Sequence, residues 1–148
     1  MSTTEKLLIV GTETTVISAA AISNNQNAIS STFNNTIGST GDGSTMVRIK
    51  ISITMGVGAT ANTGLSLYIL KSSDAGSTFE DGATGTGYTP LRMPDLVCPA
   101  PVDTTNRTLS FDRLLPAGQM KFLPRNEGTG QSMSSVTITV LPITRSSV

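Results

Sequence analysis

The sequence contains no histidine and no tryptophan, and it has one cysteine and only 14% charged residues among its 148. Without histidine, a serine–histidine–aspartate or cysteine–histidine catalytic site is impossible, and zinc sites lose a common ligand. A single cysteine, Cys98, cannot form a disulfide within the chain. Aromatic residues make up 4%, which leaves little material for stacking on sugars or bases.

The ten basic and ten acidic side chains balance, and no cluster of lysine and arginine occurs. Nucleic-acid binding and attraction to anionic membranes both need a positive surface, so we expect neither partner. The longest apolar-rich stretches, residues 7–10 and 136–143, are far shorter than the ~20 residues of a membrane-spanning helix. The first residues lack the basic and apolar regions of a secretory signal, so we expect synthesis in the cytoplasm.

Serine and threonine account for 41 residues, and together with valine, isoleucine and glycine they dominate the chain. These residue types are typical of strands and turns, whereas runs of good helix formers are absent. We therefore expect an all-β protein. The one exception is residues 18–29, where Ala19, Ala20 and Ala21 could form a short turn.

The clearest strand signal covers residues 46–55, where apolar and polar side chains alternate with a period of two. The apolar set that we expect in the core is Val47, Ile49, Ile51, Ile53 and Met55. We expect this strand to be central in its sheet. The sequence predicts further strands at residues 7–10, 14–17, 65–69, 108–115, 119–123 and 135–141.

All seven prolines lie at or after position 90. Four of them, Pro90, Pro94, Pro99 and Pro101, exclude a helix or central strand between them, so this segment is predicted to be an extended edge or a surface crossover. The Leu-Pro-Ala-Gly sequence at residues 115–118 predicts a tight turn. Pro142 predicts that the last strand ends at a sheet edge.

About seven or eight short strands separated by turn signals predict a single domain with an antiparallel, jelly-roll-like β-sandwich. We assign residues 46–148 to the sandwich body. Residues 1–45 are assigned to an N-terminal strand segment followed by a polar loop or arm.

The polar segment at residues 23–44 is rich in asparagine and glycine and has few large apolar residues. Such a segment buries too little to offset its ordering entropy, so we do not expect it to support the core. It is either a mobile loop or an arm that becomes ordered against a partner. In the second case Ile29, Phe33 and Ile37 would bind that partner.

No residues with a convincing catalytic, metal-binding or cofactor-binding pattern emerge, and we expect the protein not to be an enzyme. Cys98 has no neighbouring cation or helix start to activate its thiol, so a buried apolar role is expected. Asp74, Glu80 and Asp81 offer oxygens suited to calcium, but their spacing is not that of an EF-hand. We expect Asp74 to bond its own backbone in a turn. The remaining carboxylates that could form a glycosidase pair also lie at turns: Asp95, Asp103, Asp112 and Glu127.

Two runs in the second half of the chain carry a family resemblance. Residues 67–82 combine a strand, a Ser-x-Asp-x-Gly turn, an aromatic residue and Asp-Gly. Residues 115–131 combine the Leu-Pro-Ala-Gly turn, a Lys-Phe strand and a turn that begins at Asn126. In this order and spacing, residues 46–143 resemble small virion structural proteins of tailed bacteriophages, of the capsid cement or decoration type.

The resemblance implies a jelly-roll-like β-sandwich on the capsid surface of a virion, with no cofactor. Its implied partners are the major capsid protein, whose subunit contacts it would stabilise, and further copies of itself in a dimer or trimer. Two alternatives stay open. The chain could be a tail or head-completion structural protein, or a displayed carbohydrate-binding or adhesion module.

Overall fold

The computed structural model describes residues 6–8, 11–35, 44–60, 63–80 and 89–146. Within these residues the chain forms ten β-strands and no α-helix, which confirms the all-β prediction. The strands are β1 (Lys6–Leu8), β2 (Thr14–Ile22), β3 (Phe33–Asn35), β4 (Ser44–Met55), β5 (Gly64–Lys71), β6 (Leu96–Pro99), β7 (Arg107–Pro116), β8 (Gly118–Asn126), β9 (Met133–Pro142) and β10 (Thr144–Ser146). The expected number, seven or eight, was too low because strands of three or four residues carry little periodic signal.

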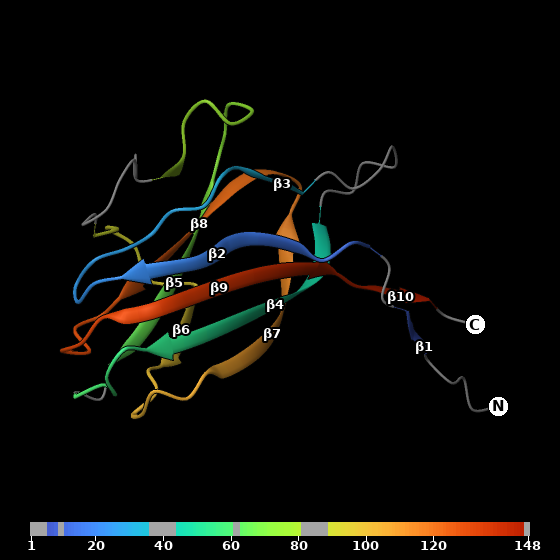
Figure 1. Ribbon diagram of the computed structural model, residues 1–148. Helices are drawn as coiled ribbons and strands as arrows, with labels where there is room; N and C mark the ends of the chain where they lie inside the picture. Colours follow the sequence, from blue (N-terminus) through green and yellow to red (C-terminus); the bar gives the residue numbers. More distant parts are fainter. Residues whose placement is uncertain (1–5, 9–10, 36–43, 61–62, 81–88, 147–148) are drawn as a thin grey trace.

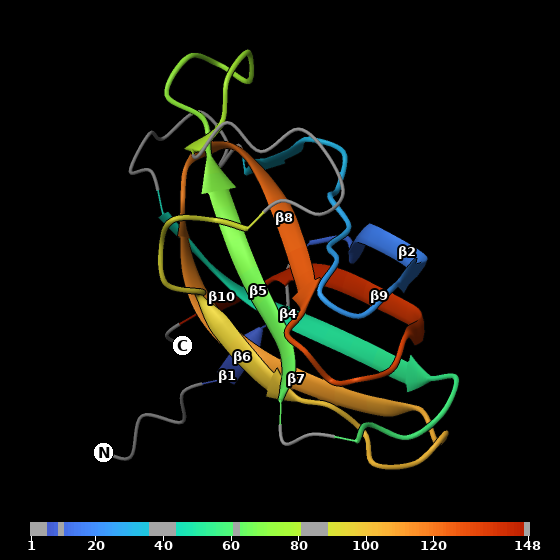
Figure 2. The same cartoon turned by 90° about the vertical axis from the view of Figure 1, so that its left-hand side faces the viewer.

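Eight of the strands form two four-stranded antiparallel sheets that face each other as a sandwich (Figures 1 and 2). The strand orders are β2-β9-β4-β7 and β3-β8-β5-β6. Four antiparallel pairs, β2 with β9, β3 with β8, β4 with β7 and β5 with β6, make the chain a long hairpin wound into two sheets. This is jelly-roll connectivity. The short pair of β1 and β10 extends from the sandwich and carries both termini (Figure 1).

The core lies between the two sheets, and β4 supplies much of it. As predicted, β4 is central, between β9 and β7, and its alternate apolar residues are fully buried. The predicted inward residues of the neighbouring strands are buried as well: Val136, Ile138 and Val140 on β9, and Met120 and Phe122 on β8. The period of two thus identified the inward face of each of these strands correctly.

On β5 both faces are covered. Leu65, Leu67 and Ile69 point into the main core as predicted, and Tyr68 and Leu70 on the opposite face are also buried. That outer face belongs to a second, smaller cluster, which Ile29 and Phe79 partly cover. The alternation therefore identified the strand but not the covering of its outer face.

Two expectations from the sequence, one about Ala19, Ala20 and Ala21 and one about Pro142, are wrong. The alanines expected in a turn lie inside β2, where Ala19 has a φ of +46° and the pairing with β9 shifts register. Packing on β9 therefore outweighs the weak preference of alanine. Pro142 does not mark a sheet edge, because β9 runs between β2 and β4 and the proline lies only at the end of the strand.

Residues 23–35 also differ from expectation, because they run along β8 as an edge of the second sheet. The backbone amide of Asn126 donates to the backbone carbonyl of Gln26 over 2.9 Å, and the backbone amide of Ser30 donates to the backbone carbonyl of Phe122 over 2.9 Å. β3 then continues the same antiparallel pairing. The expectation of a mobile loop or arm is therefore wrong for residues 23–35, while residues 36–43 lie outside the described part.

Backbone pairing explains why such a polar segment can be ordered. Its polar side chains also form hydrogen bonds: the Ser30 hydroxyl accepts from the Phe122 amide over 2.9 Å, and the Asn35 side chain donates to the Pro116 carbonyl over 2.7 Å. β2 and β3 thus place a strand from residues 1–45 in each sheet, and the division at residue 45 does not separate two structural units.

β8 continues through Pro124 to Asn126, three residues beyond its predicted end at Leu123. The Pro124 carbonyl accepts from the Ala28 amide over 3.0 Å, so this residue's missing N–H also faces the edge segment. The pairing of Pro124 with Leu67 on β5 is therefore undisturbed.

Candidate interaction surface

The most exposed large apolar side chains lie around β6. Leu91, Met93, Val97 and Val102 have exposed fractions of 93%, 83%, 63% and 78%, and they fall within twelve residues of chain. We call these four residues the apolar rim. Because these side chains are close in sequence and highly exposed, we take this stretch of chain as the candidate interaction surface.

The local sequence explains why the rim is exposed. β6 is a four-residue edge strand, and among the described strands it pairs with β5 alone, which confirms the predicted extended edge. Pro94 precedes the strand and Pro99 ends it, so it cannot grow into a longer ladder. Alternation along β6 then buries Cys98 and leaves Val97 facing outward.

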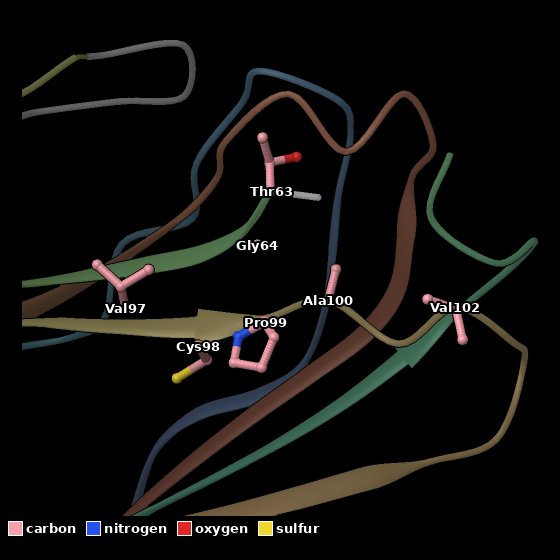
Figure 3. A pocket seen from close by; sticks show the side chains of 7 residues that line it. All are labelled: Thr63, Gly64, Val97, Cys98, Pro99, Ala100 and Val102. Atoms are coloured by element: carbon pink, nitrogen blue, oxygen red, sulfur yellow. The ribbon is translucent and has the colours of Figure 1, made fainter. Parts of the chain in front are cut away.

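A groove of about 390 Å³ lies beside the rim, between the start of β5 and the chain that follows β6 (Figure 3). It is lined by Thr63, Gly64, Val97, Cys98, Pro99, Ala100 and Val102, none of which carries a charge. A Cβ atom at Gly64 would come within 1.8 Å of the Cys98 carbonyl oxygen. Only glycine therefore allows β5 and β6 to approach this closely. Because no lining residue is charged, the groove fits an uncharged group.

Hydrogen bonds made by Arg92 and Asp95 hold the chain next to Leu91 and Met93 in place. The Arg92 guanidinium donates to the Ile69 carbonyl over 3.0 Å, to Glu80 over 2.8 Å and to Asp95 over 3.0 Å. The Asp95 carboxylate in turn accepts from the Ile69 amide over 2.7 Å. Because Arg92 lies between Leu91 and Met93 in sequence, these bonds fix the backbone from which both apolar side chains project.

Arg113 on β7 connects the rim to the opposite sheet, because its guanidinium donates to the Asp95 carbonyl oxygen. The chain around Arg92 and Asp95, which carries Leu91 and Met93, is therefore held to both sheets. A surface fixed in this way loses little conformational entropy when it binds.

Cys98 is fully buried in the main core, as expected, and it also forms part of the lining of the groove. Burial raises the pKa of its thiol to about 11, from an ordinary value of 9.0. The thiol is therefore protonated at neutral pH and behaves as a small apolar group.

Asp74 forms the expected turn. Its carboxylate accepts from the backbone amides of Ser77 and Thr78 over 3.1 and 2.7 Å, and also from the Thr78 and Ser72 hydroxyls. The bonds from Thr78 are the main reason that the pKa of Asp74 falls to about 2. Asp81 lies outside the described residues, and among those described no three acidic or cysteine side chains are grouped to hold a metal.

The other carboxylates weighed as a glycosidase pair are each bonded to a cation. Asp95 shares Arg92 with Glu80, Asp103 pairs with Arg107, Asp112 with Arg48 and Glu127 with Arg125. The pKa of Asp112 is held below its usual range chiefly by the hydrogen bond from Arg48. The Asp112 pair joins β7 to β4, whereas Asp95, Asp103 and Glu127 pair with arginines two to four residues away in the chain. Each carboxylate therefore has a structural partner.

Of the three residues predicted to bind a partner, the structure places two against the sandwich. Ile29 packs on the cluster that contains Tyr68, and the Phe33 ring meets the Phe122 ring edge-on with centroids 5.8 Å apart. Ile37 lies outside the described residues. Ile29 and Phe33 thus contribute to the stability of the fold, and partner binding by the three residues stays a prediction.

The apolar rim was missed by the sequence reasoning, although a signal existed. Leu91, Met93 and Val97 are interspersed with prolines in a segment already predicted to be an edge or surface crossover. Apolar residues in such a segment have no second strand to cover them, so their exposure could have been inferred.

No helix in the described ranges is long and apolar enough to cross a membrane. A scan against protein-family models and a search of curated proteins found no match to this chain.

Proposed function

We propose that this protein is a structural virion protein of a tailed bacteriophage, of the capsid cement or decoration type. It binds the outer shell and stabilises contacts between subunits of the major capsid protein. The observation that carries the proposal is the apolar rim, held by Arg92 on a jelly-roll sandwich. Jelly rolls are common in virion proteins, and the resemblance over residues 46–143 points to the same class.

The rim supplies a physical basis for cementing. Fully burying an aliphatic side chain contributes about 1.5–3 kcal/mol, and Leu91 and Met93 are almost wholly exposed before binding. The loss of translational and rotational freedom offsets much of that gain. The remainder is small for each copy, but it accumulates over the many copies that bind one shell.

The uncharged groove and the neutral chain predict how binding depends on salt. A partner that contacts the rim gains little from electrostatic steering, because the net charge is zero and no groove residue is charged. Attachment to shells should therefore change little between low and high salt.

Co-sedimentation with shells stripped of this protein tests the proposal. A double variant, Leu91→Asp with Met93→Asp, should lose most binding, because two carboxylates would be placed at an apolar contact. The matched control is Thr14→Asp with Thr15→Asp, which adds the same charge at exposed positions on β2. The proposal fails if the native protein does not sediment with shells, or if the rim variant binds as well as the control.

Two other roles are separated by different measurements. A tail or head-completion protein would be present in a few copies per particle, whereas a cement protein would be present in hundreds. A carbohydrate-binding or adhesion module also fits a jelly roll, since lectins use this architecture. Binding to a glycan array that survives the rim substitutions would favour that module.

A further inference from the structure

The four sheet edges of the sandwich differ in what protects them from another strand. β7 carries Arg107, Asp112 and Arg113, and charged side chains protect an edge. β2 is interrupted by three register shifts, and residues 23–35 pair with β8 through an isolated bridge and the short β3. β6 carries no charge, and its register with β5 is unbroken. Its protection is its length of four residues and its final proline, so a short strand can still pair with it.

The free side of β6 belongs to Val97. Beyond the end of β6, the Ala100 amide donates to the Thr63 carbonyl over 3.3 Å, in the same register as the ladder between β5 and β6. Bonded pairs in an antiparallel ladder recur at every second residue, so Val97, opposite Ser66, lies between two bonded pairs. The backbone N–H and C=O groups of Val97 therefore point away from β5.

The bonds of β5 with β8 agree with this orientation. The Glu127 amide donates to the Gly64 carbonyl over 2.9 Å, so the even-numbered residues of β5, including Ser66, bond to β8. The backbone groups of Ser66 are thus engaged on the side away from Val97. Within the described ranges, no loop or side chain bonds to either backbone group of Val97.

Asp95 and Pro99 set the limits of this free edge. The Asp95 carbonyl accepts from the Arg113 guanidinium, and the Asp95 amide donates to the Leu67 carbonyl over 2.8 Å. Pro99 has no N–H, but its carbonyl points in the same direction as that of Val97. The free edge therefore offers one donor, the Val97 N–H, and two acceptors, the carbonyls of Val97 and Pro99.

We propose that this edge of β6 pairs antiparallel with a short, extended, uncharged segment of the partner protein on which the apolar rim docks. One residue of the segment exchanges two backbone bonds with Val97, and the residue two positions before it donates its N–H to the Pro99 carbonyl. The inference rests on the proposed function, because it states how the same surface holds its partner.

The groove beside β6 selects the side chains of the segment (Figure 3). A residue opposite Val97 places its side chain on the face of the sheet to which Val97 points. Val97 and Val102 are exposed, and no residue that lines the groove is charged. An aliphatic side chain there covers both valines, whereas a charged one would lose water without gaining an opposite charge.

A second copy of this chain fits the edge less well than another protein. Two β6 strands opposed at Val97 would exchange two bonds, and the Asp95 amide of one would face the Pro99 carbonyl of the other. That amide already donates to the Leu67 carbonyl. A segment with free amides makes all three bonds, so we assign the edge to the partner protein.

Co-sedimentation with stripped shells tests the pairing. Val97→Pro removes the outward N–H and leaves the bonds to β5 intact, so it should weaken binding by about tenfold or more. Val97→Ala is the matched control, because it shortens the outward side chain but keeps the N–H, and it should weaken binding less. Val102→Asp and Val102→Lys should both weaken binding, and tighter binding by either one would overturn the uncharged segment.

Amide hydrogen exchange on the isolated chain tests the edge without any shell. The Val97 amide should exchange freely, whereas the Cys98 amide, which lies in the ladder with β5, should exchange slowly. Circular dichroism and thermal melting establish that each variant is folded.

The outcomes separate this inference from the cementing role. Slow exchange of the Val97 amide in the isolated chain, or equal binding by folded Val97→Pro and Val97→Ala, overturns the pairing while the cementing role stands. A dimer of the isolated chain that Val97→Pro dissociates would overturn the assignment to another protein. If the native chain does not sediment with shells, the cementing role fails and the pairing fails with it.

Discussion

The edge segment at residues 23–35 gives the sharpest test of how this fold is held together. Its residue Ser30 is buried, and the Ser30 hydroxyl accepts a hydrogen bond from the Phe122 amide over 2.9 Å. Three residues later, Phe33 packs edge-on against the ring of the same Phe122. We expect both Ser30→Ala and Phe33→Ala to lower the free energy of unfolding substantially.

The structure sets the size of each effect. Ser30→Ala leaves the buried Phe122 amide without an acceptor, which costs about 1–3 kcal/mol. Truncating a fully buried phenylalanine costs about 3–5 kcal/mol, and because Phe33 is only half-buried we expect about 2 kcal/mol. The two losses share Phe122, so the double variant should not be strictly additive. Against a total stability of about 5–15 kcal/mol, these are large fractions.

Equilibrium urea unfolding, followed by circular dichroism, measures these changes. Ser31→Ala is the control, since Ser31 is exposed and the substitution should change stability by less than about 0.5 kcal/mol. If Ser30→Ala and Phe33→Ala match this control, the segment does not support the sandwich. In that case the mobile loop or arm expected from sequence would be the better description.

Three further predictions concern other parts of the chain. Ile51→Asp should abolish folding as seen by circular dichroism, because Ile51 is fully buried. Lys50→Asp should stay folded, because Lys50 is about half exposed and its ion pair with Glu13 lies at the surface. Cys98 should react with a thiol reagent at neutral pH only as fast as the protein unfolds, and fast labelling of the folded protein would contradict its burial and its raised pKa. Asp74 has a folded pKa of about 2 against an ordinary value of 3.8, so its contribution to stability is present above pH ~4 and lost as the pH falls towards 2; Asp74→Asn should remove that part of the acid dependence of thermal melting.

The strands of the main core were predictable because their side chains alternate. On β4 and β9, apolar residues at every second position leave only one face that can be buried. That local pattern needs no knowledge of the neighbouring strands. The prolines at residues 90–101, and not the alternation, predicted an extended edge or a surface crossover, and the structure has the edge strand β6 there.

The edge segment at residues 23–35 was not predictable in this way. Its order depends on backbone bonds to β8, and on the bond between Ser30 and Phe122, which are 92 residues apart in the chain. Neither contact can be inferred from the amino-acid composition. The prediction of a turn at the alanines of β2 was wrong for a related reason, because pairing with β9 decides their conformation and alanine has no preference for strands.

Only part of the candidate surface could have been predicted from the sequence. Leu91 and Met93 could have been recognised as exposed, because they lie among prolines at a predicted edge. The rigid support from Arg92 could not, because it depends on where Ile69, Glu80 and Asp95 meet in space. Ile29 and Phe33 were chosen as partner anchors because the covering of β8 and of the outer face of β5 was not visible in the sequence.

An electron-microscopy map of the phage particle tests the proposed cementing role most directly. We expect the jelly roll on the outer surface of the head, in many copies, with Leu91, Met93, Val97 and Val102 facing major capsid protein subunits. Density for this chain at the tail or at a single vertex, or on the head with the apolar rim turned to solvent, would contradict the proposal.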